Sequence, residues 1–286
     1  MAIILITGTS TGIGFAIAQT LAESSHTVYA AMRNPQRSQA LQQLAEKENL
    51  PITILTMDVD SDESVQHAIG SVLEKEGDID VLVNNAGLPG GSAVEETSIE
   101  VYRALMETNY LGTLRCIKMV LPSMRERRSG CIINITSVAG KLYSHFHSAY
   151  CGTKAAVEAM SESLAQEVSS YNIRIALVEP GVIETPIFTK AAPPPGTTHY
   201  PNIRRLKAFF AASLENHIQP TVVADVVKDI AEGRSTKFRN PAGPDALPLL
   251  QWRASVPDEV WIHAHDMDDE TWIRSQEEHL NVRKYM

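Results

Sequence analysis

Residues 2–23 read AIILITGTSTGIGFAIAQTLAE, and this stretch decides the fold. The apolar run at 2–7 predicts a buried strand, and the apolar spacing within 13–23 predicts an amphipathic helix. Between them lies a turn rich in glycine, TGTSTGIG at 7–14. A strand joined through a tight turn to a helix is the building unit of a parallel sheet covered by helices.

The same alternation continues along the chain. Further apolar runs predict strands at 26–32, 51–57, 79–83, 131–136, 173–178 and 236–240. Helical patterns are found at 36–48, 61–74, 99–126 (kinked near Pro122), from about Tyr150 onward and at 221–232. Because strands and helices alternate and the strands are apolar throughout, we predict an α/β fold. It is a Rossmann-type, doubly wound, seven-stranded parallel sheet in three αβα layers, with a C-terminal extension.

Composition excludes several classes of partner. The chain has 286 residues, of which 44% are hydrophobic and 21% charged, with a net charge of −9. This acidic balance argues against nucleic acid and against an anionic membrane surface. No apolar run approaches the roughly 20 residues that a membrane-spanning helix needs. Three cysteines without metal-ligand spacing (Cys116, Cys131 and Cys151) favour reduced thiols in the cytoplasm and no metal site.

The glycine-rich turn predicts a phosphate-binding site. Parallel sheets bind ligands at the carboxyl ends of their strands, near the point where the strand order reverses. Gly8 permits the tight turn, Gly12 lets the backbone approach a pyrophosphate, and Gly14 lets the helix pack closely. The helix N-terminus would then hold the phosphates through its free N–H groups. The alternative is a plain strand-to-helix turn.

The end of the second predicted strand indicates which dinucleotide is used. A carboxylate here would bind a ribose 2′-hydroxyl, but no acidic residue occurs between Glu23 and Glu46. Arg33 is instead placed to bind a 2′-phosphate by charge-assisted hydrogen bonds. We therefore expect NADP(H) in preference to NAD(H). The alternative is that Arg33 is a solvated side chain.

A tyrosine and a lysine four residues apart suggest acid–base chemistry. Tyr150 and Lys154 would share one face of a helix. A phenol has a pKa near ~10, and a neighbouring ammonium group lowers it. The tuned tyrosine can exchange a proton with a substrate oxygen that Ser137 also binds. Without the other motifs, the pair would be read as a surface contact.

Together these motifs resemble those of the short-chain dehydrogenase/reductase family, in its short single-domain branch. The segment VYAAMRN at 28–34 is similar to the 17β-hydroxysteroid and retinol dehydrogenase group. The resemblance covers residues 2 to about 190 and rests on motifs in the family's order: TGTSTGIG at 7–14, Asp58, NNAG at 84–87, Asn109, Ser137, Tyr150, Lys154, Pro180-Gly181 and Thr185.

The resemblance implies a catalytic role for four residues. Tyr150 would be the general acid/base, and Ser137 would polarise the substrate carbonyl. Lys154 would lower the pKa of Tyr150 and hold the nicotinamide ribose. Asn109 would hold a water that links Lys154 to solvent. The implied reaction interconverts a carbonyl and a secondary or primary alcohol by hydride transfer.

The resemblance also implies a cofactor site. Asp58 and Val59 would contact the adenine, and the segment after Pro180 would flank the nicotinamide. The expected cofactor contacts are Gly8, Thr9, Ser10, Thr11, Gly12, Ile13, Gly14, Arg33, Asp58, Val59, Asn85, Ala86, Gly87, Tyr150, Lys154, Pro180, Gly181, Val182 and Thr185.

Substrate specificity is expected after the family motifs. Residues 1–250 would form one catalytic domain, in which about 186–220 is a lid that contains Pro193-Pro194-Pro195-Gly196 and an aromatic helix. Leu142, Tyr143, Phe146, Phe188, Leu206, Phe209 and Phe210 favour a lipophilic substrate, such as a steroid, a retinoid or another ketone. His145 and His147 either reach a polar substrate group or are ordinary loop residues. The tail at 251–286 would pack on the body or on a neighbouring subunit.

Two other functions are compatible with this cofactor fold. One is a non-catalytic NADP(H) sensor or scaffold, which the complete set of catalytic residues disfavours. The other is a lyase or epimerase, which would carry a larger C-terminal substrate domain. A helix face of small side chains (Ala155, Ala156, Ala159 and Met160) suggests a homodimer or homotetramer, although it could equally pack against the chain's own sheet.

Overall fold

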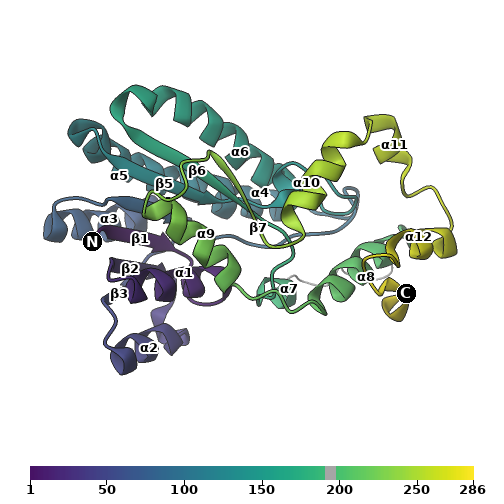
Figure 1. Cartoon of the computed structure of the whole chain (residues 1–286), viewed down its shortest axis with the longest axis horizontal. Coiled ribbons are helices and arrows are strands. Elements are labelled where there is room, and N and C mark those ends of the chain that lie inside the picture. Colours follow the sequence, from purple (N-terminus) through teal and green to yellow (C-terminus); the bar gives the residue numbers. More distant parts are fainter. Residues whose placement is uncertain (191–197) are drawn as a thin grey trace.

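The computed structural model describes residues 1–190 and 198–286. Its centre is a seven-stranded sheet in the order β3-β2-β1-β4-β5-β6-β7, in which all neighbouring strands run parallel (Figure 1). The predicted fold class is therefore confirmed. The strands are β1 (Ile3–Thr7), β2 (Thr27–Met32), β3 (Ile52–Thr56), β4 (Val81–Asn84), β5 (Gly130–Ile135), β6 (Ile173–Pro180) and β7 (Arg239–Ala242).

Helices connect the strands and form the C-terminal region. The α-helices are α1 (Gly12–Glu23), α2 (Ala40–Glu48), α3 (Asp62–Glu76), α4 (Ile99–Met106), α5 (Gly112–Arg127), α6 (Ser148–Val168), α7 (Ile187–Lys190), α8 (Ile203–Leu214), α9 (Thr221–Ala231), α10 (Ala246–Ser255), α11 (Asp258–His263) and α12 (Asp269–Gln276). Short 3₁₀ turns are η1 (Pro35–Arg37), η3 (Val138–Gly140), η4 (Ser169–Tyr171) and η5 (Val282–Tyr285), and η2 (Glu107–Leu111) is a π turn.

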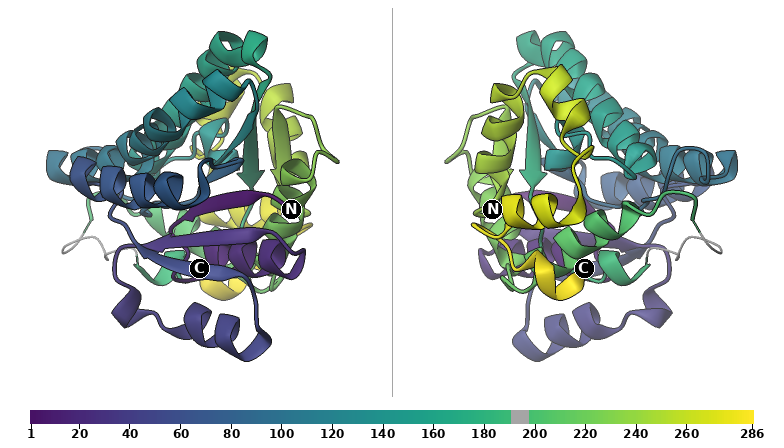
Figure 2. Two further views of the ribbon diagram at one scale, coloured as in Figure 1. Left: turned by 90° about the vertical axis from the view of Figure 1, so that its left-hand side faces the viewer. Right: turned by 90° about the vertical axis from the view of Figure 1, so that its right-hand side faces the viewer.

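Two apolar layers hold the sheet between its helices. Successive side chains of a strand point to opposite faces, so Ile4 and Ile6 pack in one layer and Leu5 packs in the other. Helices α1, α2 and α9 cover the first face, and α3, α5 and α6 cover the second (Figure 2). Every strand except the edge strands β3 and β7 is therefore shielded from water on both faces.

The order of the strands places the site. The chain passes from β1 outward to β2 and β3, then returns to add β4 on the other side of β1. The reversal lies between β1 and β4, where the ends of both strands meet at one edge of the sheet. A parallel sheet has its natural ligand crevice at this point.

Several predicted boundaries were wrong; the helix predicted for 36–48, for example, begins at Ala40. The helix predicted for 99–126 is interrupted at the π turn η2 and not at Pro122, which lies inside α5. A proline removes the N–H that would bond to the carbonyl four residues earlier. That carbonyl belongs to Lys118, and both residues are exposed, so water can solvate it and the helix continues. The seventh strand begins at Arg239, three residues later than predicted.

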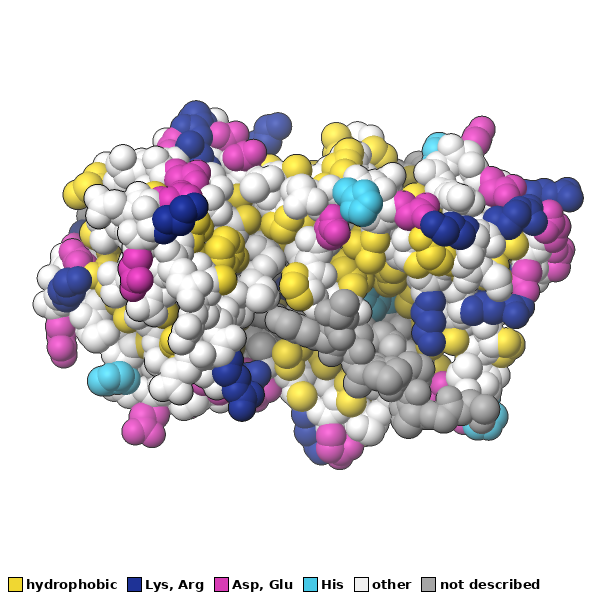
Figure 3. Space-filling view, turned by 90° about the horizontal axis from the view of Figure 1, so that it is seen from below, with side chains coloured by type: hydrophobic (Ala, Val, Ile, Leu, Met, Phe, Trp, Pro, Cys, Tyr) yellow, Lys and Arg dark blue, Asp and Glu magenta, His cyan; other side chains and the backbone are white. Residues whose placement is uncertain are grey.

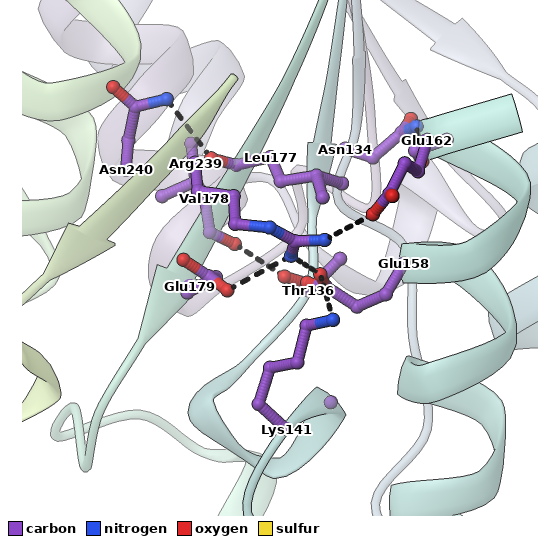
Figure 4. A network of polar contacts seen from close by, with 12 residues as sticks. Asn134, Thr136, Lys141, Glu158, Glu162, Leu177, Val178, Glu179, Arg239 and Asn240 are labelled. Carbon is purple, nitrogen blue, oxygen red and sulfur yellow. Dashed lines mark hydrogen bonds and ion pairs between the residues drawn. The ribbon is translucent and has the colours of Figure 1, made fainter. Parts of the chain in front are cut away.

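An arginine on the edge strand fixes α6 to the sheet (Figure 4). The guanidinium of Arg239, in β7, lies 2.9 Å from Glu162 and 3.4 Å from Glu179, and it also pairs with Glu158. Glu158 and Glu162 belong to α6, whereas Glu179 belongs to β6. Because Glu158 and Glu179 are both only 2% exposed, their charges need this partner. The network therefore sets the position of α6 relative to β6 and β7.

The C-terminal segment packs on α8. Trp272, Ile273 and Val282 form a small apolar cluster with Ala208 and Ala212 of α8. Helix α12 and the C-terminus accordingly lie beside α8, at the end of the molecule remote from β2 and β3 (Figures 1 and 2).

A buried arginine joins α8 to this segment. Arg205 is 2% exposed, and its guanidinium donates to the carbonyls of His265 and Met267 at 3.1 and 2.8 Å. It also donates to Asp269 at 3.0 Å and stacks over Trp272. These contacts fix the tail to α8.

The predicted lid is only partly described. Its residues 186–190 include α7, and residues 198–220 include α8. The predicted loop Pro193-Pro194-Pro195-Gly196 lies outside the described residues. Within the two described ranges, no helix is both long and apolar enough to span a membrane.

Candidate active site

The turn between β1 and α1 has no room for side chains at two of its glycines. Gly8 has a φ of +71°, in the left-handed region that favours glycine. A Cβ on Gly14 would lie 2.3 Å from the Gly8 carbonyl oxygen and 2.4 Å from the Asn85 side-chain nitrogen. Helix α1 therefore starts directly against the end of β1. Its first N–H groups, which have no partners within the helix, face the edge where the strands end.

Neighbouring segments fix the rest of the turn. The backbone N and the hydroxyl of Thr9 both donate to the Ala31 carbonyl at 3.1 Å. The Ser10 carbonyl accepts from the hydroxyl of Ser38 at 2.7 Å. A Cβ on Gly12 would lie 3.2 Å from the Thr185 side chain. The remaining turn residues are Thr11, which precedes α1 as its N-cap, and Ile13, which packs against the first apolar layer.

The end of β4 is tied to this turn. The Thr7 hydroxyl accepts from the backbone N of Asn85 at 3.0 Å and of Ala86 at 2.9 Å. The Asn85 side chain donates to the carbonyls of Thr7 and Gly8, at 3.0 Å each. Gly87 follows at the same edge of the sheet. The structure thus brings the predicted Asn-Ala-Gly segment against the glycine-rich turn.

The residues predicted to bind the adenosine end follow β2 and β3. Arg33 is exposed, and within residues 1–190 and 198–286 it makes no hydrogen bond or ion pair. The backbone N of Asp58 donates to the Ser64 hydroxyl at 2.9 Å. Val59 is buried against α5. Because β3, β2 and β1 are adjacent in the sheet, these residues lie in a row beside the turn.

Tyr150, Lys154 and Ser137 come together as predicted from their spacing. Helix α6 begins at Ser148, so Tyr150 and Lys154 lie one turn apart near its N-terminus. The Lys154 ammonium is 5.6 Å from the centre of the Tyr150 ring, and it donates to the Ile135 carbonyl at 2.8 Å. Ser137 follows β5, and its hydroxyl donates to the Pro180 carbonyl at 3.4 Å.

The protonation equilibria differ from the expectation in one respect. Burial raises the pKa of the Tyr150 phenol above its usual value, and a side-chain hydrogen bond with Ser137 opposes this shift. The Lys154 ammonium donates to the Ile135 carbonyl and makes no hydrogen bond to the Tyr150 hydroxyl among the described residues, so burial dominates the pKa of Tyr150. Burial lowers the pKa of Lys154 itself to about 8. Desolvation thus disfavours the charged form of both groups, and it keeps the Tyr150 phenol uncharged, as a proton donor must be.

Asn109 lies in the π turn and holds the loop after β4. It is 1% exposed. Its side-chain oxygen accepts from the Leu88 N at 2.7 Å, and its side-chain nitrogen donates to the Leu88 carbonyl at 3.1 Å and to the Thr153 hydroxyl at 3.0 Å. The Thr153 hydroxyl donates in turn to the Tyr150 carbonyl. Asn109 thus connects the β4 loop to the turn of α6 between Tyr150 and Lys154.

The end of β6 depends on a residue that sequence reasoning missed. Asp245, just before α10, accepts a hydrogen bond from the Val182 N at 2.8 Å. A Cβ on Gly181 would lie 2.1 Å from the same carboxylate. The predicted segment from Pro180 to Thr185 is therefore shaped by the chain after β7. In the sequence, the only signal at this position is the turn pattern PAGPDA at 241–246, which follows the predicted seventh strand.

Aromatic side chains cover the site from α8. His147 stacks on Tyr150, with ring centroids 4.9 Å apart and an interplanar angle of 15°. Phe210, in α8, contacts His147 at 5.7 Å and Phe188 at 5.4 Å. Phe209 packs on Phe210. Phe188, Phe209 and Phe210 are thus linked to Tyr150 through His147, whereas Phe146 packs on His145 and Tyr200 and Tyr143 is exposed.

Other reactive groups lie apart from this site or inside the core. The three cysteines are free and buried, and burial raises the pKa of Cys116 to about 12 and of Cys131 to about 11. No group of three or more His, Cys, Asp or Glu that could hold a metal ion occurs among the described residues.

Comparisons with known proteins agree with this arrangement. The model of the short chain dehydrogenase family matches residues 2–195. A 3-ketodihydrosphingosine reductase of Bacteroides thetaiotaomicron is 40% identical, over 92% of this chain and 96% of the relative. Retinol dehydrogenase 8 of Bos taurus is 37% identical, over 89% of this chain and 85% of the relative. A solved short-chain dehydrogenase from Streptomyces avermitilis has a TM-score of 0.80 at 30% identity, and the match covers 97% and 96% of the two chains.

Proposed function

The chain belongs to the short-chain dehydrogenase family, whose members are oxidoreductases that act on CH–OH groups with NAD(P), and we propose that it is an NADP(H)-dependent enzyme for a lipophilic substrate. It would interconvert a ketone or aldehyde with its secondary or primary alcohol. Tyr150 would be the general acid/base. The observation that carries the proposal is the convergence of Tyr150, Lys154 and Ser137 at the crevice beside the glycine-rich turn.

The residues present fit a dinucleotide. A Cβ at Gly14 would collide with the turn itself, so only glycine leaves the start of α1 open to a pyrophosphate. The residues that would hold the cofactor are those of the turn at 8–14, Arg33, Asp58, Val59, 85–87, Tyr150, Lys154, Pro180, Gly181, Val182 and Thr185. When bound, the nicotinamide supplies the hydride to the substrate carbon or takes it away.

The preference for NADP(H) rests on Arg33. This guanidinium is exposed beside the turn and has no partner within the described ranges. It is therefore available for a 2′-phosphate, which it would bind by charge-assisted hydrogen bonds. No carboxylate occurs from 24 to 45, where one would be needed to select a free 2′-hydroxyl.

The chain's own residues would manage the proton. In the reductive direction, the Ser137 hydroxyl would bind the carbonyl oxygen and Tyr150 would give it a proton. Lys154, with a pKa of about 8, still carries its charge at neutral pH in most molecules. That charge would stabilise the phenolate left behind, across the 5.6 Å to the ring. Asn109 would hold the adjoining loop and a relay water.

The aromatic cluster supports a lipophilic substrate. Phe188 and Phe209 both contact Phe210. Phe210 contacts His147, which stacks on Tyr150. Figure 3 shows hydrophobic side chains on the underside of the molecule. Two relatives are named for a ketodihydrosphingosine and for retinol, and both compounds are lipids. We propose that the segment 186–220 covers such a substrate as a lid.

We also propose the division into domain and tail, the oligomeric state and the location of the protein. Residues 1–250 would be one catalytic domain, and the tail at 251–286 would brace the lid through α8. The α6 face of Ala155, Ala156, Ala159 and Met160 is partly exposed and suits a homodimer or homotetramer. Three unpaired thiols suit the reducing cytoplasm.

A panel of ketones tests the proposal. NADPH and NADH oxidation would be measured with ketones that range from small and polar to the size of steroids and retinoids. We expect turnover with NADPH that increases with apolar bulk. Tight NADPH binding without turnover of any ketone would support the alternative, a non-catalytic sensor. Equal rates with both cofactors would refute the role of Arg33 but not the reaction.

A further inference from the structure

We propose that His147 forms a polar subsite beside Tyr150, which binds a hydroxyl or amino group that the substrate carries a few bonds from its carbonyl. The inference rests on the proposed reductase function and narrows it. The substrate would be a carbonyl compound with a polar substituent near the reacting carbon and an apolar remainder.

The first observation is the position of the imidazole ring. His147 immediately precedes α6, three residues before Tyr150, and the two rings stack almost in parallel at 4.9 Å. Stacking places the imidazole against the face of the phenol ring. A substrate whose oxygen is hydrogen-bonded to the Tyr150 hydroxyl would therefore lie near the His147 ring.

The second observation is that several elements enclose this ring. Phe210, in α8, contacts His147 edge-on at 5.7 Å. On another side, a Cβ at Gly91, in the loop after β4, would lie 3.4 Å from the His147 ring. The His147 ring thus lies between α6, α8 and the loop that contains Gly91.

The third observation concerns its hydrogen bonds. Throughout the described part of the chain, neither ring nitrogen of His147 has a hydrogen-bond partner. The neighbouring His145 shows the contrast, because its two nitrogens are enclosed without a partner and its ring lies against His265 at 3.7 Å. The nitrogens of His147 are not enclosed in this way. Each nitrogen keeps some accessible surface, so a substrate group could reach it.

Chemistry then selects the kind of group that binds. Burial lowers the pKa of His147 to about 4, so the ring is neutral at pH 7. A neutral imidazole offers one donor N–H and one acceptor nitrogen. It can accept a hydrogen bond from a hydroxyl or an ammonium group without repelling either, and it gives no charge attraction to a carboxylate. An uncharged or basic substituent is therefore favoured over an acidic one.

Matched ketones test the subsite. The compounds are a long-chain methyl ketone and its α-hydroxy and α-amino derivatives. Wild-type enzyme should have a kcat/KM for the substituted ketones that is higher by roughly tenfold, the effect of one hydrogen bond. His147→Phe keeps a stacked ring and should lose this preference, while its kcat/KM for the plain ketone stays within a factor of about three. His147→Gln, which retains a donor and an acceptor, should keep part of the preference.

The same compounds can be tested without turnover. Their binding to the complex with NADP⁺ can be followed by tryptophan fluorescence, and the ratio of Kd values should show the same preference and the same loss. A wild-type enzyme that binds and reduces all three ketones equally would overturn the subsite. Equal losses for all three in His147→Phe would show that His147 only supports the structure. If no ketone is reduced, the proposed function fails, and the ratio of Kd values still decides on His147.

Discussion

Arg33→Ala should weaken the binding of NADPH and leave the binding of NADH unchanged. Arg33 follows β2 next to the glycine-rich turn, and the Thr9 and Ser38 hydrogen bonds hold its loop against that turn. It has no partner within residues 1–190 and 198–286, so the substitution removes no internal contact. A surface change of this kind alters the free energy of unfolding by no more than about 0.5 kcal/mol.

The size of the effect follows from the contact that is lost. A hydrogen bond to a charged group contributes about 1.5–3 kcal/mol, and each 1.4 kcal/mol is about tenfold in affinity. Since Arg33 is exposed, solvent and salt screen its charge, and the lower part of this range applies. We expect a loss of roughly 10- to 40-fold in NADPH affinity.

The assay is a fluorescence titration of NADPH and of NADH at several salt concentrations. Wild-type preference for NADPH should decrease as salt increases, because the Debye length falls to about 3 Å at 1 M salt. Arg37→Ala is the matched control, since Arg37 is an exposed arginine in the same loop. The reasoning is refuted if Arg33→Ala and wild type bind NADPH equally, or if Arg33→Ala loses NADH binding to the same extent.

Two further predictions concern the C-terminal segment and His145, whose ring lies against His265 of that segment. Arg205→Met should leave the carbonyls of His265 and Met267 without this hydrogen-bond donor, so amide exchange in 264–286 should accelerate while exchange in the sheet is unaffected. Arg204→Met is the control, because Arg204 is exposed and the change of charge is the same, and it should have a smaller effect. Equal acceleration in the two variants would contradict the role of Arg205. Burial lowers the pKa of His145 to about 3. The contribution of the neutral His145 ring to the free energy of unfolding is therefore complete above the unfolded pKa of ~6.5, and it is lost as pH falls toward 3. Urea unfolding between pH 7 and 4 should show this loss, and His145→Phe should have a flatter dependence; identical slopes would contradict the assignment.

The sequence alone was sufficient for the parts of the fold that depend on local patterns. The runs AIILIT and CIINIT are mostly apolar, and both form strands buried on two faces. The edge strand β7 has the sequence RNPA, which carries no apolar run, so its start was misplaced. Its place in the sheet depends on pairing with β6 and on the contacts of Arg239, and these are not local properties.

In the active site, too, local sequence predicted some features, whereas others depend on tertiary contacts. The spacing of Tyr150 and Lys154 predicted that they share a helix face, and they do. The pKa of Tyr150 was beyond sequence reasoning, because it depends on burial and on the hydrogen bond with Ser137. The π turn at Asn109 and the contact of Asp245 with Val182 also arise from tertiary packing, which no periodicity reports.

The central claim is that Tyr150 exchanges the proton with the substrate oxygen. The most direct measurement is NADPH oxidation by Tyr150→Phe with the best ketone of the panel, together with NADPH binding. We predict that kcat falls by at least about 10²-fold while the Kd for NADPH stays within a factor of about two. Tyr143→Phe, which changes a tyrosine that is 51% exposed in a nearby loop, should retain activity. A Tyr150→Phe variant with near-wild-type kcat would contradict the account.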